Sequence, residues 1–308
     1  MAKRVFPELR VSPLLATRSM FREMLSYGLH TFLANLSLRS VNQSAPLLIG
    51  HFLPTAFVGY YRTPANLMQY TVDLVNRVGF VTGSNAAELA AKGDLATVTR
   101  MGLYVNRYCF TLFAPIAIAM TIYGQALLAV WYRPEFASHA GPLLAIMAVG
   151  TTLGIAAQFN SSSILYGLGK HHGYARSMTV EAILSVVGMF LVIPKYGILG
   201  AAWVSAVLMI LNRGLYTAWL LSRATGCDFW EYLAGIYVRP FLIAIPVLLA
   251  GYWVKEHWLS GMNWVQALSG MALIAISYYA IAFFVCLREE HRALPWTWMK
   301  ARFSAAAA

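Results

Sequence analysis

Long apolar segments recur along the whole chain and are separated by short polar breaks. A helix of about 20 apolar residues crosses a hydrocarbon core of about 30 Å. About eight segments reach this length, at 24–50, 56–82, 106–131, 140–166, 174–193, 198–222, 236–256 and 264–287. The pattern predicts an all-α polytopic membrane protein of about eight transmembrane helices.

Two of these segments carry polar residues at helical spacing. The set in the first segment is Asn35, Arg39 and Asn42, and the set in the second is Arg62, Asn66, Gln69, Asp73 and Arg77. Residues three or four apart share one face of a helix. A charge at the bilayer centre costs roughly 2.5–3.5 kcal/mol on insertion scales, so these faces should avoid lipid. We expect them to face each other or a wet cavity, as in a transport pathway.

Arg39 is the main candidate for binding an anion, because a guanidinium makes bidentate contacts with phosphate. The alternative is a structural arginine that bonds to helix carbonyls or pairs with Asp73. Arg62 and Arg77 lie close enough to predicted helix ends to reach lipid headgroups instead. Asp73 and Arg77 are also spaced to neutralise each other as an i,i+4 pair.

Other polar residues occur in the later segments. Arg213 is a further cation. Asp73 and Glu181 are candidates for ion coupling, and the alternative for Glu181 is a bond to Arg176 or a serine. The short polar residues either bind sugar hydroxyls and water or join helices by hydrogen bonds. They are Gln158, Asn160, Ser161, Ser162 and Ser163. The pair His171–His172 is expected to be solvated, and no metal site is expected.

The composition agrees with a membrane protein, being 59% hydrophobic and only 11% charged, with a mean hydropathy of +0.60. Soluble domains average about 25% charged residues. The net charge of +11 would suggest nucleic acid in a soluble protein. Here the basic residues follow the membrane pattern, and only Arg133, Lys195 and Lys255 occupy the alternate loops. The bias predicts cytoplasmic termini and a lipid environment, with no nucleic-acid partner.

A polar break at 223–231 suggests a division of the chain. We expect a basic cytoplasmic or interfacial segment at 1–22 and a six-helix unit lining a polar cavity at 23–223. A peripheral helix pair would follow at 224–288, and a cytoplasmic tail at 289–308.

Several short motifs occur in an order that resembles a known family. They are His51–Pro54 followed by Val58–Tyr61, Glu88–Asp94, Pro115, Leu165–Lys170 and the turn Pro194–Trp203 (PKYGILGAAW). Together they resemble the polysaccharide biosynthesis and export proteins. These include the Wzx-type flippases of the multidrug/oligosaccharidyl-lipid/polysaccharide exporter (MOP) superfamily. The resemblance covers about residues 24–222. Asn42 departs from it, because the family often has Asp there.

The resemblance implies a fold and a function. Family members have two six-helix lobes around a central cavity, and this chain resembles the second lobe plus the last helix pair. The implied activity is flipping of a polyisoprenyl-diphosphate-linked oligosaccharide across the bacterial inner membrane by alternating access. The chain would act as a homodimer or with a separate first-lobe subunit. Neither a cofactor nor an enzymatic activity is implied.

Three alternatives remain at this point. The first is a non-transporting membrane subunit that scaffolds glycan-assembly enzymes, and it predicts that Arg39 and Asp73 pair internally. The second is a truncated, inactive lobe. The third is an enzyme of lipid-linked glycan synthesis, which would need a carboxylate pair or a metal site. The sequence has no GxxxxGK[ST] phosphate loop for nucleotide hydrolysis.

Overall fold

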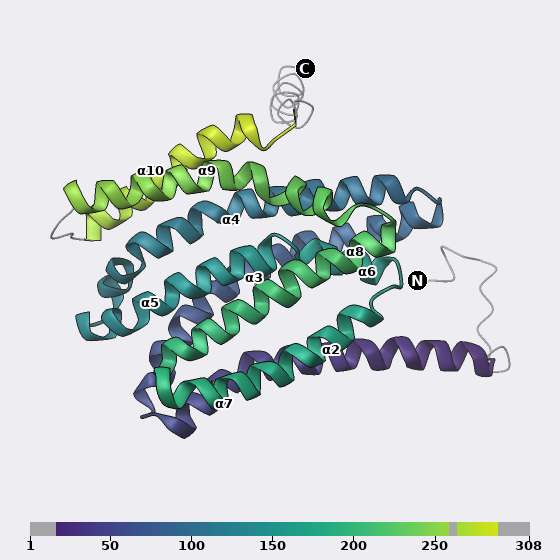
Figure 1. Cartoon of the computed structure of the whole chain (residues 1–308), viewed down its shortest axis with the longest axis horizontal. Coiled ribbons are helices and arrows are strands. Elements are labelled where there is room, and N and C mark those ends of the chain that lie inside the picture. The colour runs from purple at the N-terminus through teal and green to yellow at the C-terminus, as the bar shows by residue number, and fades with distance from the viewer. Residues whose placement is uncertain (1–16, 259–263, 289–308) are drawn as a thin grey trace, which may run out of the picture.

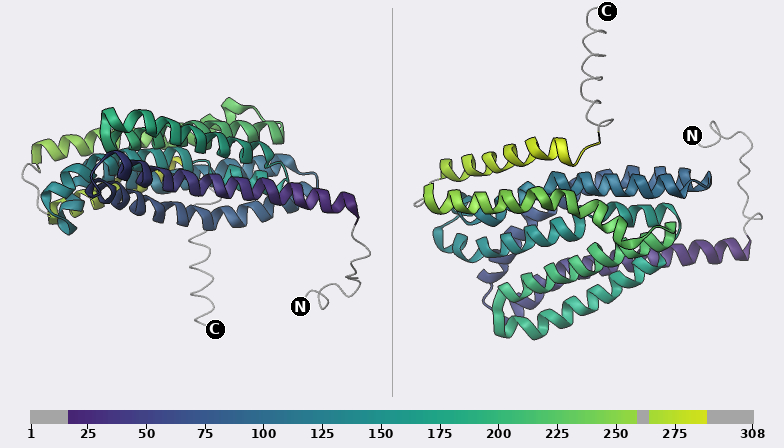
Figure 2. Two further views of the ribbon diagram at one scale, coloured as in Figure 1. Left: turned by 90° about the horizontal axis from the view of Figure 1, so that it is seen from below. Right: turned by 45° about the horizontal axis from the view of Figure 1, so that its top comes forward.

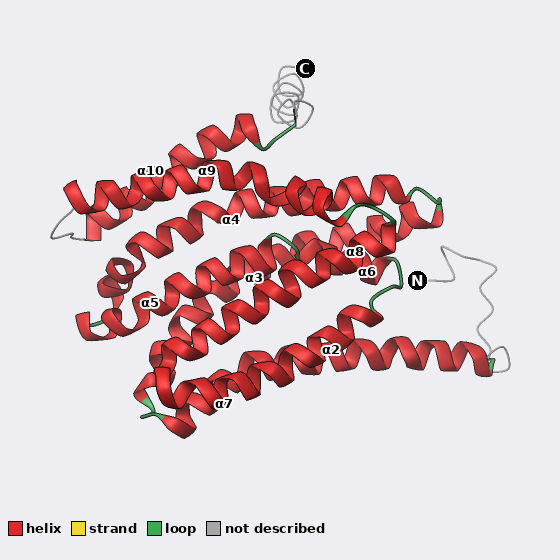
Figure 3. Cartoon of the chain, viewed as in Figure 1, coloured by secondary structure: helices red, strands yellow, loops and turns green. Residues whose placement is uncertain are grey.

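The computed structural model describes residues 17–258 and 264–288, and these residues form helices joined by short loops (Figures 1 and 3). No strand occurs in the described residues. The predicted all-α class is therefore confirmed. The expected basic segment at 1–22 lies mostly outside the described residues, apart from Arg18–Arg22, which belong to the first helix. The expected tail at 289–308 lies wholly outside them.

Each predicted span corresponds to one helix or to a run of helical segments. The single helices are α2 (Arg18–Phe52), α3 (Ala56–Ala91), α4 (Leu95–Trp131), α9 (Phe229–Trp258) and α10 (Trp264–Val285). The fourth span consists of α5 (Pro134–Thr151), the π-helical segment η2 (Thr152–Ala156) and α6 (Phe159–Gly167). The fifth and sixth consist of α7 (His172–Leu208), the π-helical segment η3 (Met209–Tyr216) and α8 (Thr217–Thr225).

Five of the described helical segments are long and apolar enough to cross a membrane. They are α4, α5 to α6, α7 to α8, α9 and α10. The segment from α7 to α8 is a hairpin, so it contains two of the predicted spans. Helices α2 and α3, with 35 and 36 residues, are also long enough to cross a membrane. They carry the two polar stripes, however, and are not among the five apolar segments.

The hairpin turns at Gly197, whose φ of 60° and ψ of −148° lie outside the helical region. Glycine adopts this conformation at little steric cost, whereas a side chain would be strained there. The predicted tight turn between the fifth and sixth spans is confirmed. Because the two arms run antiparallel, residues equally distant from Gly197 along the chain lie opposite each other.

A short loop with a defined cap connects α3 to α4. The backbone amide of Thr97 donates a hydrogen bond to Asp94 Oδ1 at 3.0 Å, so Asp94 is the N-cap of α4. The hydrogen bonds from the hydroxyl and the amide of Thr97 lower the pKa of the Asp94 carboxyl. The loops 92–94, 168–171 and 226–228 lie at one end of the bundle, and the turns at 53–55, at 132–133 and at Gly197 lie at the opposite end (Figure 1).

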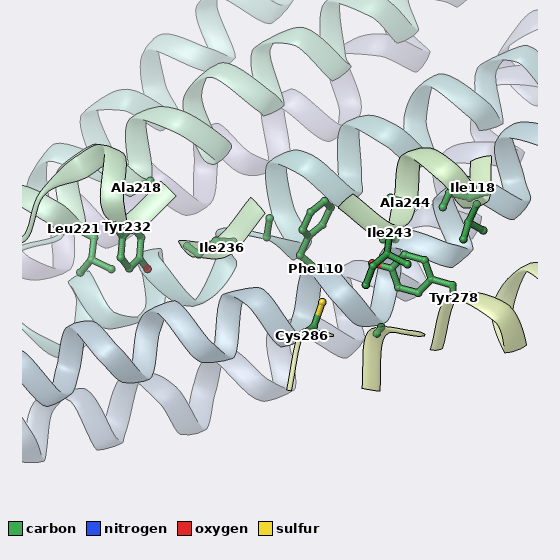
Figure 4. Close-up of a cluster of buried hydrophobic side chains, with 14 of the residues drawn as sticks. Phe110, Ile118, Ala218, Leu221, Tyr232, Ile236, Ile243, Ala244, Tyr278 and Cys286 are labelled. Carbon is green, nitrogen blue, oxygen red and sulfur yellow. The ribbon is translucent and has the colours of Figure 1, made fainter. Parts of the chain in front are cut away.

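The largest apolar core joins α4 to α8, α9 and α10. Phe110, Tyr232, Ile236 and Tyr278 are among its buried side chains (Figure 4). Helices α9 and α10 pack along α4 (Figure 2), and only 22% of each of their most apolar windows is buried. Their remaining faces are apolar and exposed, as expected for helices in contact with lipid.

The two π-helical segments pack against each other at glycines. A Cβ atom on Gly154 of η2 would lie 2.7 Å from the carbonyl oxygen of Met209 in η3. A Cβ on Gly150 of α5 would lie 2.8 Å from that of Ala206 in α7. Only glycine permits this close approach, and small residues commonly allow it between membrane helices. The crossing of η2 and η3 is called the π seam below.

We predict that Gly154→Ala destabilises the protein by about 1–3 kcal/mol, because its methyl group would collide with the backbone of η3. The matched control is Gly59→Ala in α3, where a Cβ would meet no atom within 4 Å. The control should be stabilising by about 0.5–1 kcal/mol, since alanine favours a helix. Thermal unfolding of the purified full chain in detergent micelles measures the change in stability of both variants. Equal melting temperatures would show that the seam is loose.

Candidate functional site

A polar groove of about 420 Å³ lies among α2, α3, the segment α5 to α6, α7 and η3. Its volume falls within the roughly 300–1,000 Å³ typical of small-molecule sites. The groove exists because α2 packs mainly on α7 whereas α3 packs mainly on α5 and α6, so α2 and α3 diverge. One wall consists of residues from α2 and α3, including Asn42, Gln43, Arg62, Asn66 and Gln69. The opposite wall is formed by the π seam and its neighbours, including Gln158, Ser162, Tyr174, Ser205 and Arg213.

The polar face of α2 only partly enters the groove. Asn42 lines it, whereas Arg39 and Asn35 are exposed and follow on the same face toward the N-terminus of α2. Arg39 has no hydrogen-bond or ion-pair partner among the residues that the structure describes. The internal pair with Asp73, which was the alternative for Arg39, is therefore not formed.

The polar face of α3 is divided in the same way. Arg62, Asn66 and Gln69 line the groove, and Arg62 donates a hydrogen bond to Gln43 of α2 at 2.9 Å. Asp73 and Arg77 are exposed but are not part of the groove lining. Asp73 accepts a hydrogen bond from Gln69 at 2.9 Å. The alternative i,i+4 ion pair between Asp73 and Arg77 is absent from the described structure.

A buried ion pair joins α7 to η3 at the groove. Arg213 Nη2 lies 2.7 Å from Glu181 Oε1, and Arg213 Nε donates to the same oxygen at 2.9 Å. Asn212 donates to Glu181 Oε2 at 2.6 Å. The expected partners of Glu181, Arg176 or a serine, were therefore wrong. The physical reason is the hairpin, because Glu181 and Arg213 lie at equal distances along the chain from the turn at Gly197.

A second group of polar residues is buried between α4, α6 and α9. Asn106 donates to Ser161 Oγ at 2.8 Å and to Tyr232 Oη at 3.0 Å, and Ser161 donates to Gln158 Oε1 at 2.9 Å. Thr82 of α3 donates to Asn160 Oδ1 at 3.2 Å. Asn160 and Ser161 therefore join helices, which was one of their two expected roles, and they do not line the groove.

Some of these residues were missed from the sequence. Asn106 stands at the start of a long apolar run, and the next residue, Arg107, donates from Nε to the backbone carbonyl of Gly235 in α9. Both are polar residues in an otherwise apolar helix, and this pattern could have identified them as buried hydrogen-bonding residues. Tyr232 carried no comparable signal, because tyrosines are common near membrane-helix ends.

The histidine pair also differs from expectation. His171 is fully buried, and its ring stacks on Tyr166 with the ring centroids 4.8 Å apart. His172 is exposed. The prediction that both histidines are solvated was therefore wrong for His171, because the short loop after α6 turns its ring inward against an aromatic neighbour.

Comparisons with known proteins show which proteins this chain is similar to. Residues 6–141 match a family model described as "Polysaccharide biosynthesis protein". An uncharacterised membrane protein of Methanocaldococcus jannaschii is 23% identical over 260 residues, which is 82% of this chain and 49% of that protein. The chain thus spans about half the length of this relative.

A solved structure shows where this fold occurs. It is a MOP superfamily transporter from Pyrococcus furiosus, in which the reverse polarity of the binding pocket suggests a different function. The likeness has a TM-score of 0.53 at 16% identity and covers 85% of this chain and 64% of that structure. This likeness shows that the chain shares its fold with part of that structure.

We predict that Glu181→Ala destabilises the protein by about 3–5 kcal/mol, because the buried Arg213 would lose its counter-ion. Replacing both residues, as Glu181→Leu with Arg213→Met, should recover most of that loss, since neither charge then remains buried.

The matched control is Glu88→Ala. Glu88 forms the exposed ion pair with Lys92, and surface pairs contribute little. Its melting temperature in micelles should equal that of the wild type. If Glu181→Ala also melted like the wild type, the buried pair would be energetically unimportant.

Proposed function

We propose that the chain is one half of a two-lobed exporter that moves a lipid-linked oligosaccharide or polysaccharide precursor across the cytoplasmic membrane. The observation that carries this proposal is the open polar surface on α2 and α3. Arg39, Arg62 and Arg77 have no acidic partner among the described residues, although they lie on helices of a membrane protein. The family match and the MOP-like fold support the same class of function.

The charge on this surface favours an anionic headgroup. Unpaired arginines in membrane helices normally face a bundle interior or a water-filled path and bind a partner there. A guanidinium binds the oxygens of a phosphate in a bidentate manner. A diphosphate-linked lipid would place its phosphates along Arg39, Arg62 and Arg77 while its tail stayed in the bilayer. Asn35, Asn42, Asn66 and Gln69 would supply uncharged hydrogen bonds beside them.

A second lobe would complete the path. The groove is not enclosed by the described residues, and this chain covers only about half the length of its relative. We propose that a second copy or a separate partner lobe covers the polar surface. Rocking of the two halves would then expose the headgroup on either side of the membrane in turn.

The scaffold alternative is less well supported. It requires Arg39 and Asp73 to be satisfied by each other, but Asp73 accepts a hydrogen bond from Gln69 instead. The proposed ion coupling through Glu181 also loses support, because Arg213 already neutralises this carboxylate. Asp73 remains the exposed acid on the path.

We predict that Arg39→Ala, introduced at the chromosomal locus so that any partner lobe is present, reduces export by about tenfold or more. The reason is the loss of charge-assisted hydrogen bonds to the phosphates, each worth about 1.5–3 kcal/mol. The measurement is the ratio of inner-leaflet lipid-linked oligosaccharide to surface polymer. Arg39→Lys should retain part of the activity, and the matched control Arg100→Ala, which lies on α4 and not on the polar surface of α2 and α3, should retain all of it. Equal ratios for wild type and Arg39→Ala would refute a role for Arg39.

We also predict that Arg39→Cys forms a covalent adduct with a second copy or a partner protein when native membranes are treated with a bifunctional maleimide. The experiment uses a background lacking the three native cysteines. The control, Leu191→Cys, lies on the exposed apolar face of α7 and should form no such adduct. Absence of an adduct through Arg39→Cys would argue against any covering lobe.

A further inference from the structure

We propose that the π-seam wall of the groove is a glycan-binding subsite that carries no net charge. It is distinct from the arginines on α2 and α3 that would hold phosphate. The subsite consists of Arg213 with its counter-ion Glu181, together with Gln158, Ser162 and Tyr174. This inference rests on the proposed function, because it assumes a ligand with both a phosphate and a glycan. It assigns the two parts of that ligand to opposite walls.

The first argument concerns the charge of Arg213. Its Nε and Nη2 both face the carboxylate of Glu181, whose side chain is only 1% exposed. The pair carries no net charge, so it offers little attraction to a phosphate. Yet Arg213 lines the groove, and its Nη1 has no partner among the described residues. A guanidinium held in this way is a fixed hydrogen-bond donor, the kind of group that a neutral hydroxyl needs.

The second argument concerns Gln158, which follows η2 and lines the same wall. Its side chain is 1% exposed, and its Oε1 accepts a hydrogen bond from Ser161. Its Nε2 lies close to the Tyr237 hydroxyl but makes no hydrogen bond of acceptable geometry, and that hydroxyl donates to the Leu153 carbonyl instead. A buried amide without a partner is destabilising, so a ligand or water that bonds to it removes this cost.

The third argument concerns the neighbouring hydroxyl groups. Ser162 lies one turn after Gln158, and its hydroxyl donates a hydrogen bond to the Phe159 carbonyl at 2.6 Å, so its oxygen is left to accept one. The hydroxyl-bearing Tyr174 lines the same wall. The wall therefore presents amide, guanidinium and hydroxyl groups with no net charge. Sugar hydroxyls both donate and accept hydrogen bonds, and they match this set better than a phosphate, which only accepts.

The opposite wall of the groove, formed by α2 and α3, carries a positive charge. Arg62 lines it, and its hydrogen bond goes to the neutral side chain of Gln43, so its positive charge is retained. A ligand lying across the groove would meet positive charge on the α3 side and neutral donors and acceptors at the π seam. Sites built from buried hydrogen-bonding groups strongly reject analogues that lack the matching hydroxyl. The π-seam wall would thus determine which glycan is accepted.

The test uses the purified full chain in detergent micelles and two kinds of probe. Methyl glycosides of glucose, galactose and mannose are followed by saturation-transfer NMR, which detects weak binding. Inorganic pyrophosphate is followed by ³¹P line broadening. We expect the wild type to bind at least one glycoside and to bind pyrophosphate at a separate site, so that neither displaces the other.

The variants assign each probe to a wall. Gln158→Ala and Ser162→Ala should each weaken glycoside binding by about tenfold and leave pyrophosphate binding unchanged, since each removes one hydrogen bond. Arg62→Gln should weaken pyrophosphate binding by about tenfold and leave glycoside binding unchanged. Glu181→Gln should strengthen pyrophosphate binding, because Arg213 would then carry an uncompensated charge. A purely structural role of Glu181 would not produce that gain. Gln125→Ala, an exposed glutamine outside the groove lining, is the matched control and should change neither.

Several outcomes would overturn the inference. One is the absence of glycoside binding by a wild-type chain that binds pyrophosphate, which leaves the proposed function intact. Another is loss of pyrophosphate binding in Arg213→Gln but not in Arg62→Gln, because the π seam would then be the phosphate site. Glycoside binding that is lost in Gln158→Ala, without any pyrophosphate binding, would support the inference and count against an anionic lipid as the substrate. Melting temperatures of all variants show that each remains folded.

Discussion

Polar groups inside a membrane must be paired within the protein or face water, and this constraint divides the molecule into two parts. On the side of α4, α9 and α10, Asn106 and Arg107 form hydrogen bonds within the protein, beside an apolar core around Phe110. On the side of α2 and α3, several polar residues remain exposed. The unsatisfied side is where a ligand, water or a second lobe is needed.

The π seam connects the two parts. Gly150 and Gly154 let the segment from α5 to η2 approach α7 and η3 at backbone contact distance. One consequence is that Gln158, which follows η2, and Arg213 of η3 form one wall of the groove. π-helical segments within α-helices occur frequently at functional sites, because they shift the side chains that follow them by part of a turn. Here both segments adjoin the same groove, which places the functional surface at the point where the helices cross.

Much of the fold was predictable. The apolar runs gave the positions of the helices, and the motif around Gly197 gave the hairpin. The pairing of Glu181 with Arg213 was also within reach, because a tight turn at Gly197 places them opposite each other. The same counting about the turn after α2 relates Gln43 to Arg62. Such symmetry identifies the facing turns of a hairpin, but it leaves open which side chains point toward each other.

The sequence by itself determined the class of the protein, the order of its helices and the presence of two polar faces, because these depend on local periodicity and hydropathy. Only the tertiary structure decided which polar residues meet. It separated Asn42, Arg62, Asn66 and Gln69, which line the groove, from Asn35, Arg39, Asp73 and Arg77, which lie beyond it. It also buried His171 and neutralised Arg213. The angle at which helices diverge and cross depends on backbone contacts at a few glycines between distant segments, and no local pattern records that angle.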